Sequence, residues 1–350
     1  MKYLVCPDSF KGSMTALDAA AAIASALRDV DHAAEITLLP LADGGEGTAE
    51  IVGAAFHGRR IQVDTVDALM RPIVGSYYLA EMNGKPVAVV DVATAIGLTL
   101  IDSEERDIIR ATSFGAGILM NDALKRGIRN FIVGLGGTAT CDAGKGMREA
   151  MTGDGLDYSS CGITVLCDVD NPLCGPQGAA RVFAPQKGAD PGQVEVLEKR
   201  LIAAAAKMKS YSGIEAADLQ GGGAAGGIGA MLATCFGAEL ASGIDYILDV
   251  LDFNALQESA DVIITGEGKI DRQTMHGKTI AGILRRTSKP VVAFAGKIES
   301  TPGLNSRSRK IVQITSPDMP LAEAMDPETA KRNLSAAVKT AFTHAGMRKI

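Results

Sequence analysis

Short apolar runs that end abruptly in loops of glycine and acidic residues recur along this sequence, and they restrict its fold more than any other feature. Runs of this length, rich in β-branched residues and bounded by glycine, are typical of buried parallel strands. They occupy residues 3–6, 36–41, 131–133, 163–167, 262–264 and 291–294. Patterns with helical spacing separate several of them. The sequence therefore predicts an α/β fold with a parallel sheet.

Three of the intervening segments have the spacing of helices. Residues 15–28 begin at Thr15, a candidate N-cap with Asp18 three residues further on, and they place Ile23 and Leu27 on one face. Residues 112–126 and 193–208 show similar patterns. We expect helices in all three.

The stretch from residue 60 to residue 97 follows another pattern, that of antiparallel strands. Strands are expected at 61–66, 73–79 and 87–92, and Asn83-Gly84 is a strong hairpin signal before the last of these. We interpret this stretch as the start of an inserted domain, because a 350-residue chain exceeds the size of about 250–300 residues at which single cores stop growing. The expected division has two parts. Residues 1–60 plus 240–350 would form a discontinuous Rossmann-like or flavodoxin-like parallel domain, and residues 61–239 an inserted mixed α/β domain.

Composition excludes several classes of function. The chain has 35 Lys and Arg against 41 Asp and Glu, a net charge of −6 without basic blocks, so nucleic acid and anionic membranes are poor partners. Tryptophan is absent, and the six cysteines form no C-x-x-C pair. The amino terminus reads as a strand and not as a signal peptide. We expect a cytoplasmic protein.

Acidic residues are concentrated in the loops that follow the predicted strands. Ligands of parallel sheets bind at the carboxyl ends of the strands, so these loops should gather. Phosphoryl transfer uses carboxylates to hold Mg²⁺ and to accept the substrate proton, and cations to offset charge on the phosphoryl group. Any one of these acids could equally serve a turn or a helix cap, and the argument depends on their number. The acids are Asp8, Asp43, Glu46, Asp142, Asp168, Asp170, Glu267 and Asp271, and the lysines of such loops are Lys11, Lys187, Lys269 and Lys278.

Glycine-rich motifs leave the type of nucleotide site open. Residues 272–279 lack the leading glycine of a Walker A motif. Residues 134–139 match G-x-G-x-x-[GA], which keeps a nicotinamide-dependent oxidoreductase as an alternative, although no acidic residue ends a second strand about 20 positions on. Residues 221–229 precede a helical pattern at 230–236. They could form a phosphate cradle or a close packing contact that needs small residues.

Motifs along nearly the whole chain resemble those of the bacterial glycerate kinase family, in the same order. These segments are Asp8–Ser13, Ala42–Thr48, Gly134–Gly146, Cys167–Leu173, Phe183–Ala189, Gly223–Gly229 and Thr265–Thr274. The resemblance implies a two-domain kinase without a Walker A motif and with its site in the interdomain cleft. It also implies Mg²⁺, ATP and D-glycerate, with 2-phosphoglycerate expected over 3-phosphoglycerate as the product.

The resemblance and the loop chemistry together give the candidate site. Asp8 or Asp271 is expected to accept the hydroxyl proton, with Lys11 and Lys278 stabilising charge. The metal would be held by Asp168, Asp170 and Glu267, and His276 could orient the substrate or act as a base. The expected substrate and nucleotide contacts are Ser9, Asp43, Gly44, Gly45, Glu46, Gly136, Gly137, Thr138, Asp168, Asn171, Lys187, Gly223, Gly226, Gly227, Gly266, Glu267 and His276.

Two departures from the family pattern introduce a further alternative. Cys141 stands where the family more often has asparagine, and Met151–Ile163 is shorter than the corresponding family segment. If the missing stretch supports the cleft, the chain would be a catalytically impaired homologue that binds a sugar acid. The oligomeric state is not predicted.

Overall fold

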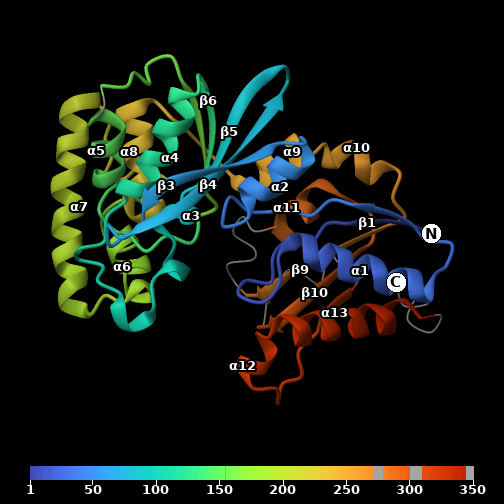
Figure 1. Ribbon diagram of the computed structural model, residues 1–350. Coiled ribbons are helices and arrows are strands. Elements are labelled where there is room, and N and C mark those ends of the chain that lie inside the picture. Colours follow the sequence, from blue (N-terminus) through green and yellow to red (C-terminus); the bar gives the residue numbers. More distant parts are fainter. Residues whose placement is uncertain (154, 272–278, 300–309, 344–350) are drawn as a thin grey trace. The chain divides into compact units, whose positions relative to one another are not determined.

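The computed structural model describes residues 1–153, 155–271, 279–299 and 310–343 (Figure 1), and the chain divides into two compact units. Unit 1 comprises residues 1–43 and 244–350, and unit 2 comprises residues 44–243. The first boundary differs from the one expected near residue 60. Residues 44–60 group with unit 2 because helix α2 (Thr48–Ala55) packs against strands β4 (Pro72–Met82) and β5 (Lys85–Asp91).

A five-stranded parallel sheet forms the centre of unit 1. Its strands are β1 (Lys2–Val5), β2 (Glu35–Leu38), β9 (Val262–Ile270), β10 (Val291–Ile298) and β11 (Lys310–Gln313). Their order is β11-β10-β9-β1-β2, and every neighbouring pair is parallel. This is the flavodoxin-like order, and it confirms the predicted parallel α/β fold. The order reverses between β1 and β9, where such sheets bind ligands.

Strands β9 and β10 run further than the sequence indicated. Gly266, Glu267 and Gly268 were expected in a loop after residue 264, but they lie within β9, where Glu267 pairs with Ala295 of β10. Glycine permits this close pairing, since a Cβ at Gly266 would lie 2.7 Å from the Phe294 carbonyl oxygen. The expectation of a post-strand loop was wrong here. Glu267 and Lys269 instead project from the end of a strand.

Helices cover both faces of this sheet. They are α1 (Ala16–Val30), α9 (Gly243–Val250), α10 (Phe253–Glu258), α11 (Thr279–Arg286), α12 (Leu321–Ala324) and α13 (Pro327–Phe342). Helix α1 begins as predicted, with Thr15 Oγ1 accepting from the Asp18 amide at 3.0 Å. Helices α1 and α13 pack together on one face around a core that includes Ile23 and Leu27 (Figure 1). Helix α11 connects β9 to β10, and this step across the sheet runs opposite to the step from β1 to β2 that α1 connects. A right-handed crossover therefore places α11 on the other face of the sheet.

Unit 2 contains a mixed six-stranded sheet. Its strands are β3 (Arg59–Val66), β4, β5, β6 (Asn130–Gly134), β7 (Gly162–Leu166) and β8 (Glu239–Ala241), in that order across the sheet. The pairs β3–β4 and β4–β5 are antiparallel, and the remaining pairs are parallel. Asn83 and Gly84 form the turn between β4 and β5 with positive φ angles of 52° and 72°. This confirms the predicted antiparallel strands and the mixed sheet.

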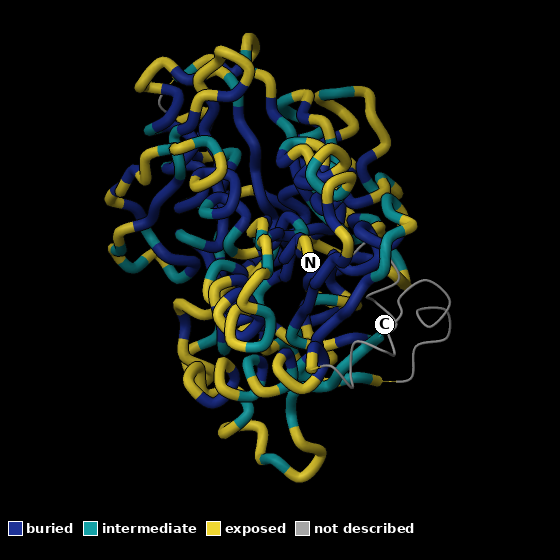
Figure 2. Tube along the Cα trace, turned by 90° about the vertical axis from the view of Figure 1, so that its right-hand side faces the viewer, coloured by how far each residue is buried: buried dark blue, intermediate teal, exposed yellow. Residues whose placement is uncertain are grey.

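The helices of unit 2 pack against both the antiparallel and the parallel strands of that sheet and contribute to its core, and Figure 2 shows buried stretches of the chain inside the trace with exposed ones on its outside. The predicted helices at 112–126 and 193–208 correspond to α4 (Phe114–Lys125) and α7 (Pro191–Ser212), and α7 begins with a capping box between Asp190 and Gln193. The described helices are α2, α3 (Ala93–Ile96), α4 (Phe114–Lys125), α5 (Lys145–Gly153), α6 (Ala179–Phe183), α7 (Pro191–Ser212) and α8 (Ile228–Phe236). The shorter 3-10 turns are η1 (Leu98–Leu100), η2 (Ser103–Glu105), η3 (Pro185–Lys187) and η4 (Ala224–Gly227).

The connection from α5 to β7 is short and anchored in the core. Tyr158 is buried, donates its hydroxyl to Asn121 Oδ1 at 2.7 Å and packs edge-on against Phe236. Across the described part of the chain, no helix has both the length and the apolar character needed to span a membrane.

Candidate functional site

Asp8 lies directly beyond β1, where the strand order of unit 1 reverses. Its side chain is buried, with Oδ2 accepting from the Thr279 hydroxyl at 2.5 Å and Oδ1 accepting from the Ser9 amide at 2.6 Å. Burial, together with the nearby Asp43 carboxylate, raises the pKa of Asp8 to about 7 against the opposing effect of its hydrogen bonds and of Lys11. A carboxylate with a pKa near neutrality can exchange a proton at physiological pH.

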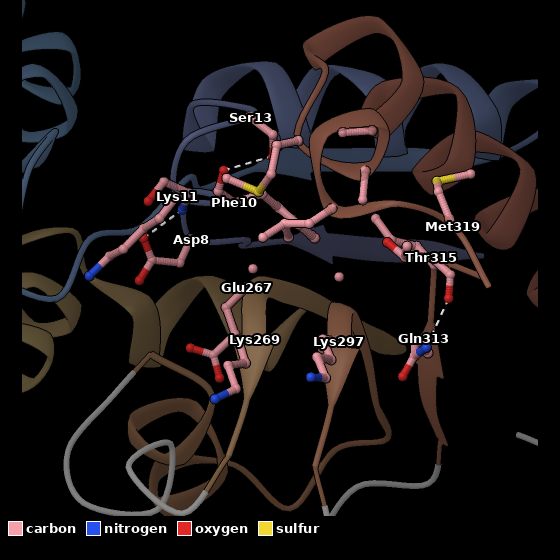
Figure 3. A pocket seen from close by; sticks show the side chains of 18 of the residues that line it. Asp8, Phe10, Lys11, Ser13, Glu267, Lys269, Lys297, Gln313, Thr315 and Met319 are labelled. Atoms are coloured by element: carbon pink, nitrogen blue, oxygen red, sulfur yellow. Dashed lines mark hydrogen bonds between the residues drawn. The ribbon is translucent and has the colours of Figure 1, made fainter. Parts of the chain in front are cut away.

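A cavity of about 520 Å³ opens beside Asp8 at the carboxyl ends of the unit 1 strands (Figure 3). It brings together five of the predicted site residues, namely Asp8, Ser9, Lys11, Asp43 and Glu267. Asp271 lies close to this group, since its carboxylate is 3.2 Å from Nζ of Lys269, which lines the cavity. The cavity also includes Lys297, which no sequence motif indicated. His276 and Lys278 lie outside the described residues.

Glycine allows the loop after β1 to lie directly on β9. A Cβ at Gly268 would be 3.2 Å from the Lys11 amide nitrogen. The Asp8 amide donates to the Gly266 carbonyl at 2.8 Å, which extends the β1–β9 pairing into the loop. These contacts hold Asp8 and Lys11 next to Glu267.

In unit 2, a buried carboxylate holds the glycine loop that precedes α2. Asp91, the last residue of β5, accepts from the Gly47 amide at 3.0 Å and from the Ala49 amide at 3.1 Å. Gly136 lies against the same loop, because a Cβ there would be 2.4 Å from Gly45 Cα. The predicted contacts Gly44, Gly45, Glu46, Gly136 and Gly137 are therefore brought together around the ends of β5 and β6.

Asp91 was missed because no glycine-rich loop follows it. The available signal was an acidic residue at the end of a predicted strand, where its carboxylate faces the amides of a neighbouring loop. Burial raises the pKa of Asp91 to about 7, although the two backbone amides favour the ionised form. Asp91 thus acts as a positioning residue for the 44–47 loop.

We predict that Asp91 makes stability depend on pH. Its pKa is about 7 in the folded chain and near 3.8 when unfolded, so folding favours the protonated form between these values. Its contribution is most favourable below about pH 4 and is lost as pH rises towards 7. Between pH 5 and pH 8, the free energy of unfolding of Asp91→Asn should therefore decline by on the order of 2–4 kcal/mol less than that of wild type, as measured by urea unfolding. The exposed Asp102→Asn serves as control, and equal pH slopes for Asp91→Asn and wild type would contradict the assignment.

Lys187 supports the loop after β6 from inside unit 2. Its ammonium is buried and donates to Thr138 Oγ1 at 3.1 Å and to the Thr140 carbonyl at 2.7 Å. Burial lowers the pKa of Lys187 to about 8. The predicted residues Lys187 and Thr138 are therefore adjacent, and in this arrangement the lysine fixes the loop conformation.

The glycines of the turn at 221–229 lie in close contact with neighbouring backbone atoms. A Cβ would lie 2.4 Å from the Pro172 carbonyl oxygen at Gly223, 2.2 Å from the Thr140 carbonyl oxygen at Gly226, and 2.6 Å from Ala143 Cα at Gly227. Residues 221–230 are all buried. Of the two readings that the sequence left open, these contacts favour the need for small residues.

The predicted metal ligands are distributed over both units. In unit 2, Asp168 Oδ1 accepts from the Gly243 amide at 2.9 Å, and Asp170 Oδ1 accepts from the Gln220 side chain at 3.0 Å. Asn171 donates to the Gln177 carbonyl at 2.8 Å. Within the described ranges, no group of three or more His, Cys, Asp or Glu side chains is arranged to hold a metal ion. Mg²⁺ commonly needs only one or two protein carboxylates alongside phosphate oxygens, and Glu267 beside Asp8 and Asp43 fits that pattern.

The flavodoxin-like sheet with carboxylates and lysines at its switch point, joined to a second α/β unit, defines a class of α/β enzymes that lack a Walker A motif. The family model of the glycerate kinase family matches residues 3–160 and 155–345. The chain belongs to the glycerate kinase family. The two matched segments meet within Met151–Ile163, the stretch that is shorter than expected.

Relatives that carry the name glycerate kinase align with most of the chain. A glycerate kinase of Bacillus subtilis strain 168 is 36% identical and spans 98% of this chain and 99% of its own length. A glycerate 2-kinase of Escherichia coli K12 is 36% identical over 87% of each chain. A crystal structure assigned to glycerate kinase 2 from Salmonella typhimurium LT2 superposes with a TM-score of 0.81, at 36% identity and 99% coverage of both chains.

Proposed function

We propose that this enzyme transfers the γ-phosphoryl group of ATP to a hydroxyl of D-glycerate, giving 2-phosphoglycerate. The observation that carries the proposal is the switch-point cavity, which joins the charged side chains of Asp8, Lys11, Asp43 and Glu267 in one pocket. Phosphoryl transfer relies on positioning and charge stabilisation, which these side chains can supply. The E. coli relative named glycerate 2-kinase supports the choice of product.

Asp8 is the proposed general base. Its raised pKa keeps it able to take the hydroxyl proton near neutral pH, and a fixed network from Ser9 and Thr279 orients its carboxylate. Asp271 is the weaker candidate because its carboxylate forms an ion pair with Lys269. Lys11 is proposed to offset charge on the transferred group, and from the sequence pattern alone Lys278 and His276 are proposed to assist.

Mg²⁺ is the proposed metal, with Glu267 as its ligand in unit 1 and Asp168 and Asp170 as candidates in unit 2. When bound, the ion would neutralise the ATP phosphates. The glycines of the loops at 44–47 and 134–137 are proposed, besides packing these loops together, to contact substrate or nucleotide through their backbone amides. Glycerate would be held through its carboxylate by a basic side chain and such amides.

The nicotinamide alternative loses its main support in the structure. Gly136 of the G-x-G-x-x-[GA] motif lies against Gly45, and a Cβ placed on Gly137 would be 3.5 Å from the Cβ of Ala93. These glycines serve the packing of two loops in unit 2. No observation favours hydride transfer over phosphoryl transfer.

Product analysis tests the proposal directly. We expect the full chain, incubated with MgATP and D-glycerate, to release ADP and to form 2-phosphoglycerate, which phosphorus NMR distinguishes from the 3-isomer. Formation of 3-phosphoglycerate would correct the product while keeping the reaction. Glycerate that raises the melting temperature without ADP release would indicate the impaired, sugar-acid-binding homologue and contradict the proposed activity.

A further inference from the structure

The unit 1 cavity has two chemically different ends. Figure 3 shows Asp8, Lys11 and Glu267 towards one side and Thr315 and Met319 at the other. The first end carries the carboxylates and lysines described above. Thr315 and Met319 belong to the segment from β11 to α12, whose cavity-lining residues are all uncharged: Gln313, Ile314, Thr315, Ser316, Pro317, Met319, Leu321 and Ala324.

The uncharged end has a fixed floor. Gln313 Oε1 accepts from the Ile298 amide at 3.0 Å, and its Nε2 donates to the Thr315 carbonyl at 2.8 Å, so the ends of β10 and β11 are tied together. Met319 is held from the side of α13, where Asn333 donates to its sulfur at 3.5 Å. This end of the cavity is therefore shaped before any ligand enters.

The outer wall of the same end is apolar and open to solvent. Leu321 is 77% exposed although its side chain lines the cavity, whereas the methyl group of Met325 lies against Gly12, next to Lys11. Exposed apolar groups at the rim of a cavity are typical of a surface that a ligand covers. Methionine suits the flat face of an aromatic ring, because its thioether is unbranched and makes favourable contacts with aromatic groups.

We propose that the purine base of the nucleotide binds at this apolar end, between Met319 and Leu321, with its phosphates towards Lys11 and Lys269. This rests on the proposed function, which places the phosphate chemistry at the polar end of the same cavity. Glycerate is a small, charged acid with little apolar surface, so it does not suit Met319 and Leu321. A cavity of about 520 Å³ is within the usual range for a small-molecule site.

Binding of ADP and of inorganic pyrophosphate separates the base from the phosphates. Leu321→Asp should weaken ADP binding about tenfold or more in calorimetry with Mg²⁺ present, because it places a charge where an apolar ring lies. Pyrophosphate affinity should stay within twofold of wild type. Met319→Gln, which keeps the unbranched shape, should act in the same direction. Ile202→Asp, on an exposed position of α7 in unit 2, is the matched control and should change neither affinity.

The outcomes distinguish the two proposals. If wild type phosphorylates glycerate and binds ADP, but Leu321→Asp and Met319→Gln bind it unchanged, the placement of the base is wrong and the function stands. If the variants lose ADP binding and pyrophosphate binding equally, the placement is also wrong, because the substitutions would then weaken binding of the phosphates and not of the base. A wild-type protein that neither binds ADP nor releases it from ATP would overturn both.

Discussion

Asp8→Asn is expected to lower kcat by about 10²–10⁴-fold while leaving the fold intact, because asparagine keeps the shape of the side chain but cannot accept the substrate proton. The measurement is a coupled assay of ADP release with D-glycerate as acceptor. Asp29→Asn is the matched control. Asp29 is an exposed acid of unit 1 whose ion pair with Lys339 lies outside the cavity, and such pairs contribute little.

The pH profile separates a base from a merely structural carboxylate. Wild-type kcat/KM should fall as pH drops below about 7, where Asp8 becomes protonated. The Thr279 hydroxyl stabilises the ionised form, so Thr279→Val should raise the pKa of Asp8 and move this limb of the profile to higher pH. A near wild-type kcat in Asp8→Asn, or a limb that does not move in Thr279→Val, would assign the base to another residue.

Gly226→Ala should be among the most destabilising single-methyl substitutions in unit 2. Its φ angle is +65°, and the added Cβ would lie 2.2 Å from the Thr140 carbonyl oxygen, which cannot move without shifting the loop that Lys187 holds. Gly237 has nearly the same φ of +66°, with nothing within 4 Å of its Cβ position. The two substitutions share the backbone strain and differ in crowding.

Urea unfolding of both variants isolates the packing contribution. Gly226→Ala should lose about 1–3 kcal/mol more than Gly237→Ala, which is the usual cost of overpacking a filled site. Equal losses would show that the turn can open to accept a side chain. Normal stability combined with weaker ATP binding in Gly226→Ala would instead favour a phosphate cradle at this turn.

The elements that sequence reasoning placed well are those with strong local signals. The Asn83-Gly84 hairpin and the α1 cap at Thr15 depend on a few neighbouring residues, and both are present in the structure. The extension of β9 was not foreseen, because glycine ordinarily weakens a strand. Here the glycines are favoured by the approach of β10 and of the loop that carries Lys11, and these contacts come from distant parts of the chain.

The candidate site was predictable in its composition but less so in its contacts. Acidic residues close behind the predicted parallel strands indicated that Asp8, Asp43 and Glu267 would lie together, although Glu267 lies within β9 and not in a loop. The same composition could not show that Asp168 caps a backbone amide, since acids that bind ligands and acids that stabilise turns look alike in a sequence. Asp91 was missed not only because no glycine-rich loop follows it but also because its hydrogen-bond partners, the Gly47 and Ala49 amides, lie more than 40 residues earlier in the chain.

The central strand of unit 1 has a consequence for how the chain is made. Strand β1 pairs with β9, and the Thr265 hydroxyl reaches the Cys6 carbonyl across 259 residues of sequence. During synthesis, all of residues 44–243 are made before β9 leaves the ribosome. Until then, the β1–α1–β2 segment of the nascent chain exposes the apolar face that carries Ile23 and Leu27, because the rest of the core around it has not been synthesised. The nascent chain is therefore most prone to aggregate during this interval.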